Sequence, residues 1–179
     1  MATNDARILV GAGVVSIGDW VTAGGSGSLV DVGHTKEPVT LGAAFEDFEV
    51  TSERAITTVK RVPIKADLTL VVPMLEMSGE HWRMAFRQPA ANLTGTAPLE
   101  TLLIGNQVEQ YHQIEVVGPA VDTANERTFT FWKGFVISIA EVPIAKADTQ
   151  VLSVTFGLLY DSSVATADKI GKWVEAVIP

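Results

Sequence analysis

The chain has 179 residues, a formal net charge of −8 and no cysteine. This length fits one ordinary domain that buries a core without disulfides, and the lack of cysteine excludes thiolate metal sites. The acidic balance argues against a protein that grips nucleic acid, because such proteins need lysine and arginine to displace counterions from phosphates. Hydrophobic residues make up 47% of the chain, yet no run approaches the roughly 18 apolar residues of a membrane helix. We therefore expect a soluble protein whose apolar excess is reserved for partners.

Residues 1–28 are predicted to form an extended arm with a glycine-serine hinge at 24–27, and residues 29–179 a single domain. The arm contains RILVGAGVVS, which looks like the opening of a dinucleotide-binding fold. Ser16 stands in place of the third glycine, however, and the β-branched residues that follow do not favour the required helix. We interpret the segment as a strand or arm in tight contact with a neighbouring subunit, ordered mainly on assembly. The candidate subunit contacts here are Ile8, Val10 and Trp20.

Alternation of apolar and polar residues runs through most of the chain and predicts β-strands. In residues 64–74 every even position is apolar, while Lys65, Asp67 and Thr69 occupy the other face. Residues 128–140 and 150–161 alternate in the same way, and the first of these groups Phe129, Phe131 and Phe135 on one face. Shorter strands are predicted at 28–32, 39–41, 45–51, 101–104, 110–117 and 173–178.

One segment carries the signals of a helix. Ser78 is a suitable N-cap, and Glu80 lies in the first turn, where a carboxylate complements the helix dipole. Pro89 ends the element at about Gln88. The sequence therefore predicts one short helix within residues 78–88, packed across a sheet.

No arrangement typical of an active site is recognisable in the sequence. The three histidines share no ligand spacing with one another or with carboxylates, and a GxSxG elbow is absent. Glu46, Asp47 and Glu49 are divided between the two faces of a strand by alternation, so they do not form an acid/base pair. We predict a non-enzymatic protein with no catalytic, cofactor-binding or metal-binding residues, and no cofactor.

Several stretches resemble, in the same chain order, the tail tube proteins of long-tailed bacteriophages. Residues 31–41, DVGHTKEPVTL, are similar to the DVGxTKGGVTL strand pair of that family, with Glu37 and Pro38 in place of the double glycine. FEDFEV at 45–50 resembles the acidic strand that follows it. The further similar stretches are VKRVP at 59–63, LEMSGEHWRMAF at 75–86, LTGTAPLETLLIG at 93–105, RTFTFWKGFVIS at 127–138 and QVLSVTFGLLYDSS at 150–163.

The resemblance implies a mainly β fold, a β-sandwich or half-barrel with one short flanking α-helix, which closes into a β-barrel tube on hexamerisation. Stacked hexameric rings would form the tail tube, the conduit for genome ejection into the host. The implied partners are other copies of the chain, the tail terminator, tape measure and tail tip proteins, and DNA that passes without sticking, with no membrane. Barrel closure would also remove the exposed sheet edges that long strands create.

The expected location is the virion, after synthesis in the host bacterial cytoplasm, because the opening MATNDAR has no secretion signal. A conduit wall for DNA must lack clustered lysine or arginine. The residues that we expect on that wall are acidic or hydroxylated: Asp47, Glu49, Asp67, Thr69, Thr130, Ser153 and Thr155. If the carboxylates lie at subunit contacts instead, their candidate partners on a neighbour are Lys60, Arg61 and Lys65.

Two alternatives remain open at the level of sequence. The tube of a contractile tail or injection system would share the fold and differ in its outer surface. A monomeric β-sandwich binding module would need an aromatic platform at one end, and the four tryptophans are dispersed along this chain.

Overall fold

The protein is described by a computed structural model over residues 13–22, 27–35, 38–51, 58–118, 125–142, 150–165 and 167–177. This part of the chain is mainly β, as predicted, with a single α-helix, α1 (Gly79–Ala85). The strands are β1 (Val14–Asp19), β2 (Val30–Asp31), β3 (Thr40–Thr51), β4 (Thr58–Met74), β5 (Leu93–Thr96), β6 (Leu99–Leu102), β7 (Tyr111–Gly118), β8 (Asn125–Ile139), β9 (Leu152–Leu158) and β10 (Gly171–Val177).

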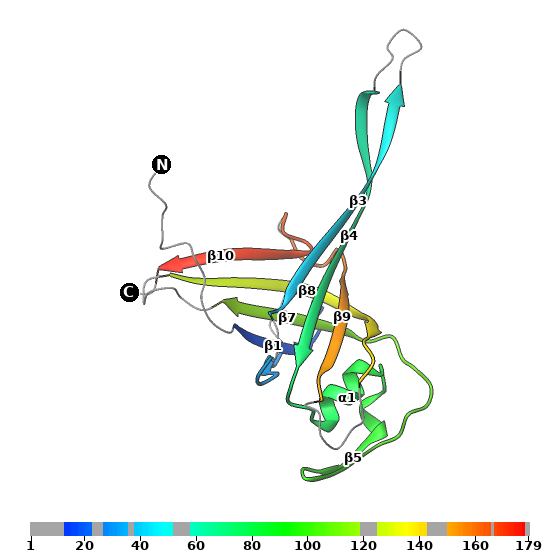
Figure 1. Ribbon diagram of the computed structural model, residues 1–179, viewed down its shortest axis with the longest axis vertical. Coiled ribbons are helices and arrows are strands. Elements are labelled where there is room, and N and C mark those ends of the chain that lie inside the picture. Colours follow the sequence, from blue (N-terminus) through cyan, green and yellow to red (C-terminus); the bar gives the residue numbers. More distant parts are fainter. Residues whose placement is uncertain are drawn as a thin grey trace.

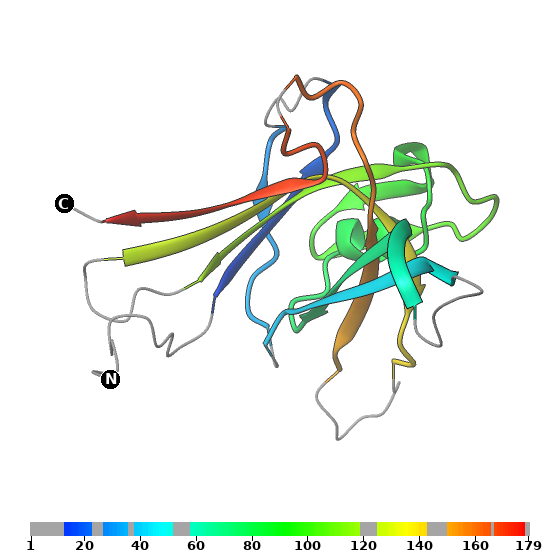
Figure 2. The same ribbon diagram turned by 90° about the horizontal axis from the view of Figure 1, so that it is seen from above.

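The strands of the main sheet pair antiparallel in the order β2-β1-β7-β8-β9-β4-β3, and β10 pairs with β8. Strand β8 has two neighbours along one of its edges, since its first part pairs with β10 and its last part with β9. The sheet consequently has two projecting parts (Figures 1 and 2). We call β1, β7, β10 and the first part of β8 the wing. We call β3 with residues 58–67 of β4 the hairpin, because the pairing of β4 with β9 begins only at Leu68.

The core lies where the sheet bends between these two parts. Val15 and Ile17 of β1 pack there with side chains of β4 and β9 such as Val72 and Phe156, and α1 covers them with Met84. Strand β1 therefore belongs to the body of the domain, so the predicted boundary at residue 28 is wrong for residues 14–19. The alternation of Val15 and Ile17 provided the core signal, and the glycines on either side obscured it. Residues 1–12 and 23–26 lie outside the described residues.

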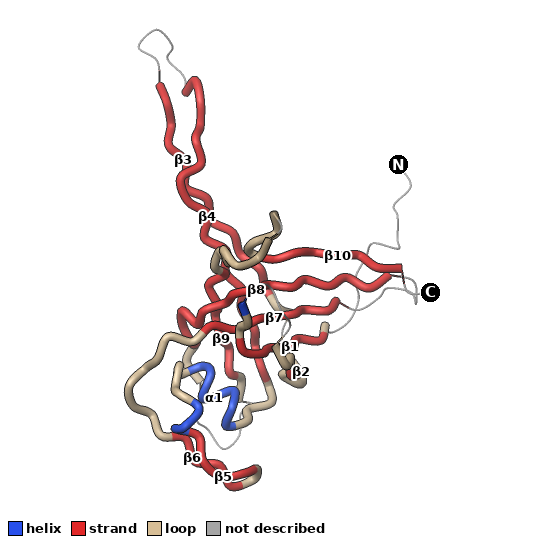
Figure 3. The backbone as a smooth tube through the Cα atoms, turned by 180° about the vertical axis from the view of Figure 1, so that it is seen from behind, coloured by secondary structure: helices blue, strands red, loops and turns tan. Residues whose placement is uncertain are grey.

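Helix α1 begins as predicted. The Ser78 side chain accepts a hydrogen bond from the His81 backbone N–H, and Trp82 stacks on Phe86 at 5.5 Å between ring centroids. The helix ends at Ala85, earlier than the predicted Gln88, because Arg87 adopts a left-handed backbone with φ of 53°. Figure 3 shows α1 and the small β5-β6 hairpin at the end of the molecule opposite the β3-β4 hairpin. In the described part of the chain, no helix has the length and apolar character needed to cross a membrane.

Register shifts change which face some strand residues occupy. The predicted alternation holds for Leu70, Val72 and Met74, all of which are buried. In β8, a shift opposite residues 112–114 of β7 inserts an extra residue, so Phe135 pairs with Tyr111 on the face opposite Phe129 and Phe131. The prediction that these three phenylalanines share one face is therefore wrong for Phe135.

Candidate assembly surface

The distal half of the hairpin, residues 47–50 and 60–64, has an apolar and a polar side. Phe48 lies opposite Val62, and Val50 lies opposite Lys60. Side chains alternate along a strand, so the intervening pairs, Asp47 with Pro63 and Glu49 with Arg61, face the other way. Phe48 and Ile64 are 59% and 62% exposed, respectively.

The proximal half is amphipathic as well. Leu41, Ala43 and Phe45 pair with Leu70, Leu68 and Ala66 on one side, whereas Thr69, Asp67 and Lys65 pair with Gly42, Ala44 and Glu46 on the other. A register shift between Glu46 and Asp47 places an extra residue in β4, and β3 alternates through it. Along β3, Asp47 and Glu49 therefore follow Phe45 on one side of the strand, while Phe48 follows Glu46.

The exposed apolar side chains make the hairpin unusual for a ribbon of a single subunit. A two-stranded ribbon without further support is only marginally stable in water, and monomers rarely leave large apolar patches exposed. Yet large apolar side chains remain exposed along the ribbon: Leu41, Phe45, Phe48, Val50, Val62 and Ile64. The hairpin thus has the composition of an element that is buried in an assembly.

The cations of the hairpin bond within their own subunit. Arg61 lies 2.6 Å from a Glu49 carboxylate oxygen, and Lys65 lies 2.6 Å from Asp67. Lys60, in contrast, lies on the apolar side opposite Val50. Neither Arg61 nor Lys65 therefore needs the carboxylate of a neighbour that the sequence suggested. Exposed pairs of this kind contribute only about 0–1 kcal/mol each.

The predicted wall residues fall into three groups. Asp67 and Thr69 share a face with Ser153 and Thr155 of β9, because Thr69 lies opposite Gly157 and the next pairs on that side contain Thr155 and Ser153. Asp47 and Glu49 form a second group on the distal half. Thr130 stands apart, since it is only 4% exposed and its hydroxyl lies 3.4 Å from a Glu115 oxygen. Burial in the single subunit argues against a place for Thr130 on an open wall.

Trp20, a predicted subunit contact, is engaged inside the chain. Its indole N–H donates to Asp161 at 2.8 Å, and its ring meets the edge of Tyr111. The Lys133 ammonium lies 4.6 Å from the Trp20 ring centroid and 3.9 Å from that of Tyr111. The described contacts of Trp20 therefore join it to β7, to β8 and to the loop at Asp161 of the same subunit. Ile8 and Val10 lie outside the described residues.

A second apolar surface, which the sequence did not identify as a contact, lies where the hairpin meets the wing. We call it the inner corner: Leu41 of β3, Leu70 of β4, and Val116, Phe129, Phe131 and Trp173 from the wing. All of these except Trp173 line, with Val39, a groove of about 160 Å³. The Phe129 ring stacks on that of Phe131, and its centroid lies 6.4 Å from the ring centroid of Trp173. Trp173 is 54% exposed. The available signal was the placement of Trp173 next to Val174 in a predicted strand.

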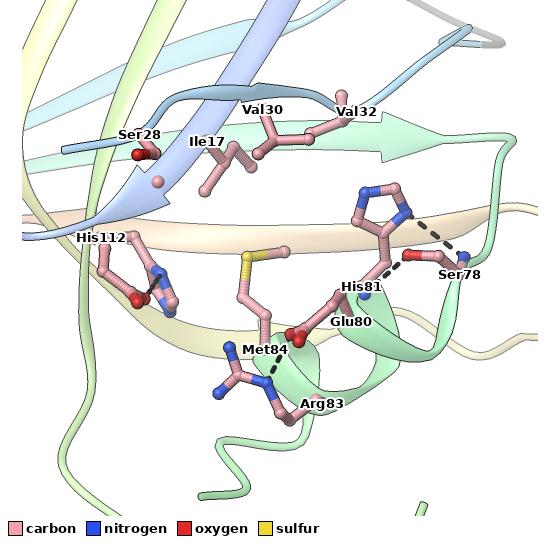
Figure 4. Close-up of a pocket in the computed structure, with 12 residues that line it drawn as sticks. Ile17, Ser28, Val30, Val32, Ser78, Glu80, His81, Arg83, Met84 and His112 are labelled. Carbon is pink, nitrogen blue, oxygen red and sulfur yellow. Dashed lines mark hydrogen bonds and ion pairs between the residues drawn. The ribbon is translucent and has the colours of Figure 1, made fainter. Parts of the chain in front are cut away.

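Two buried polar side chains, Arg83 and His112, line a pocket of about 400 Å³ beside α1 (Figure 4). Arg83 donates to Glu80 at 2.5 Å and to the Gln88 carbonyl oxygen at 3.2 Å. The pKa of His112 is lowered to about 4, chiefly by burial; the nearby Asp19 opposes this shift and Arg83 adds to it. The His112 imidazole is therefore neutral at pH 7. Among the described residues, no three His, Asp or Glu side chains gather as a metal site requires.

Comparison of the sequence with protein-family models and with curated proteins gives no match. The function is therefore inferred from the residues and from the geometry of the two apolar surfaces.

Proposed function

We propose that this chain is a self-assembling structural protein, the tail tube subunit of a long-tailed bacteriophage, whose stacked hexameric rings form the conduit for genome ejection. The observation that carries the proposal is the hairpin, which extends from the body with six large apolar side chains exposed. Burial of these side chains against other copies of the chain gives the hairpin the support that it lacks in one subunit.

The sheet edges favour the same conclusion. The outer edge of β3 has no partner among the described strands over 12 residues, and β10 pairs on one side only. Such edges carry unpaired N–H and C=O groups that pair readily with another chain, so natural proteins cover or close them. Closure of several sheets into one ring barrel removes both edges at once.

The polar sides of the sheet suit a wall along which DNA slides. The side with Asp67, Thr69, Ser153 and Thr155 is acidic and hydroxylated, and its Lys65 is held in an ion pair with Asp67. A wall of this kind offers phosphates little to bind, because counterion release needs cations that are available to DNA. The resemblance to tail tube proteins adds support, since its stretches include β3, α1 and β9 in the order of that family.

Sedimentation velocity of the purified chain at rising concentration tests the proposal. A tube subunit gives a ring species of fixed size, followed by longer multiples of that ring. A monomeric binding module stays at 19.1 kDa at every concentration, and that result would overturn the proposal. Rings that assemble and then bind a second, outer protein layer would instead place the chain in a contractile system.

A further inference from the structure

The distal half of the hairpin and the inner corner are two apolar surfaces of one chain that do not cover each other. In Figures 1 and 3 the hairpin and the wing leave the body in different directions, which carries the distal half away from the wing of its own copy. Phe48 and Val50 on the first surface and Trp173 on the second all remain exposed.

We infer that the distal half of one hairpin packs into the inner corner of the next copy. The inference rests on the proposed function, because it names the surfaces through which copies of the chain join. Phe48, Val50 and Val62 would lie against Phe129 and Trp173 of the neighbour.

Both surfaces are suited to sheet-on-sheet packing. Each is one face of an antiparallel ribbon or sheet, and two such faces stack about 10 Å apart with interdigitated side chains. The inner corner is already continuous with the core, because Phe131 at its base is buried and Phe129 packs against core residues. A neighbouring hairpin placed there would extend the core of this subunit outward along the wing.

Charged residues border both surfaces. The wing side of the inner corner ends at the Arg127 and Glu175 pair, whose side chains lie 3.5 Å apart. The apolar side of the distal half ends at Lys60, opposite Val50. An apolar centre with a polar rim is the usual anatomy of a specific protein interface.

The contact joins two different surfaces, so every copy can donate a hairpin and receive another. Head-to-tail contacts of this kind close into a ring or continue as a filament, according to the rotation between copies. A second copy of the chain is therefore the occupant that explains both exposed surfaces at once.

The absence of cysteine from the chain allows a direct test. Chains with Phe48→Cys and chains with Trp173→Cys are mixed with an equal share of wild-type chain, assembled, and treated with a bismaleimide of about 8 Å span, shorter than the spacing between stacked sheets. Asp47→Cys is the matched control on the hairpin, and Val174→Cys is the matched control on the wing, because each neighbours its test residue on the opposite side of the strand.

We expect a covalent dimer from Phe48→Cys mixed with Trp173→Cys, none from either chain alone, and at least tenfold less dimer when a control replaces its neighbour. If particles exclude the Trp173→Cys chain, Val116→Cys takes its place on the same side of the wing. Assembled particles that give no dimer, or equal dimer with the controls, would overturn the contact and leave the proposed function standing. Failure of the wild-type chain to assemble would overturn both.

Discussion

Phe48 and Val62 lie directly opposite each other on β3 and β4, and both are exposed although both are apolar. No other described element of the subunit supports this half of the ribbon, so the pair is available to a partner. We predict that Phe48→Glu abolishes assembly and leaves the free energy of unfolding of the subunit within about 0.5 kcal/mol of wild type, as for most exposed positions. Sedimentation velocity and urea unfolding measure the two effects.

Asp47→Ser is the control for that variant, because Asp47 precedes Phe48 and points to the other side of β3. It is expected to assemble like wild type. Normal assembly of Phe48→Glu would show that the distal half stays exposed in the assembly.

The buried imidazole of His112 makes the stability of the subunit dependent on pH. Its folded-state pKa of about 4 lies below the ordinary value of 6.5, so the unfolded chain binds more protons between these two values. The stabilisation is complete above pH 6.5 and is lost as the pH falls toward 4. The lowered pKa of His112 corresponds to a change of about 3 kcal/mol in the free energy of unfolding.

Urea unfolding at pH 7.5, 5.5 and 4 tests this effect in wild type and in His112→Gln. Acidic residues also titrate in this range, so the informative quantity is the difference in the free energy of unfolding between wild type and the variant. The advantage of wild type over the variant is expected to shrink by about 3 kcal/mol between pH 7.5 and pH 4. An advantage that stays constant with pH would show that His112 does not titrate as its burial requires.

Asp161 fixes the position of the Trp20 side chain through a hydrogen bond. This buried carboxylate accepts hydrogen bonds from the Trp20 indole, the Ser163 backbone N–H and the Ser163 hydroxyl. Burial opposes ionisation, but these hydrogen bonds and the nearby Lys133 lower the pKa of Asp161. We predict that Asp161→Ala lowers the free energy of unfolding by about 1–3 kcal/mol, since it removes three hydrogen bonds to a buried charged acceptor.

Chemical denaturation measures that loss, and Ser163→Ala serves as its control because the Trp20 bond to Asp161 survives in it. The control is expected to lose clearly less stability than Asp161→Ala. Equal losses in the two variants would place the stabilising role in the Ser163 turn and not in the Trp20 bond.

The acidic wall can be tested by reversal of charge. Asp47 and Asp67 lie on opposite sides of the hairpin, so in assembled particles Asp47→Lys combined with Asp67→Lys would place one cation per subunit on whichever side forms the wall, and its weak contacts with phosphates would add along the tube. We expect these particles to retain duplex DNA in a form that resists nuclease, with retention that falls steeply from 50 to 200 mM salt, the range over which such contacts weaken. The Lys65 pair with Asp67 is exposed to solvent, so its loss is expected to have little effect on the stability of the fold.

Glu76→Lys combined with Glu141→Lys makes the same change of charge away from the hairpin and is expected to protect no DNA. If nuclease-resistant DNA is found with the control particles and not with the Asp47→Lys and Asp67→Lys particles, Asp47 and Asp67 lie away from the path of DNA.

Alternation and capping predicted much of the fold. Residues 64–74 form a strand with its even positions inward near the core, and Ser78 caps α1 as expected. The register shifts were not predictable, because an extra residue in β4 or β8 depends on pairing with a distant strand and has no local sequence signal. Strand β3 was predicted in two pieces, since Gly42, Ala43 and Ala44 have low β-propensity and become strand only through pairing with β4.

Of the two candidate surfaces, the polar face of the sheet follows from alternation, whereas the inner corner does not. Asp67 and Thr69 of β4 share one face with Ser153 and Thr155 of β9, because both strands alternate regularly there; their place on a wall stays a prediction. The inner corner was missed because it joins Leu41 to Phe129 and Trp173, residues far apart in the chain that meet only through the order of the strands.

Electron microscopy of the purified wild-type chain shows whether it forms a tube. We expect closed rings with a lumen wide enough for duplex DNA in end-on averages, and tubes built from the same rings in side views. Small particles of single-subunit size without a lumen, at concentrations where the chain is folded, would contradict the proposed function.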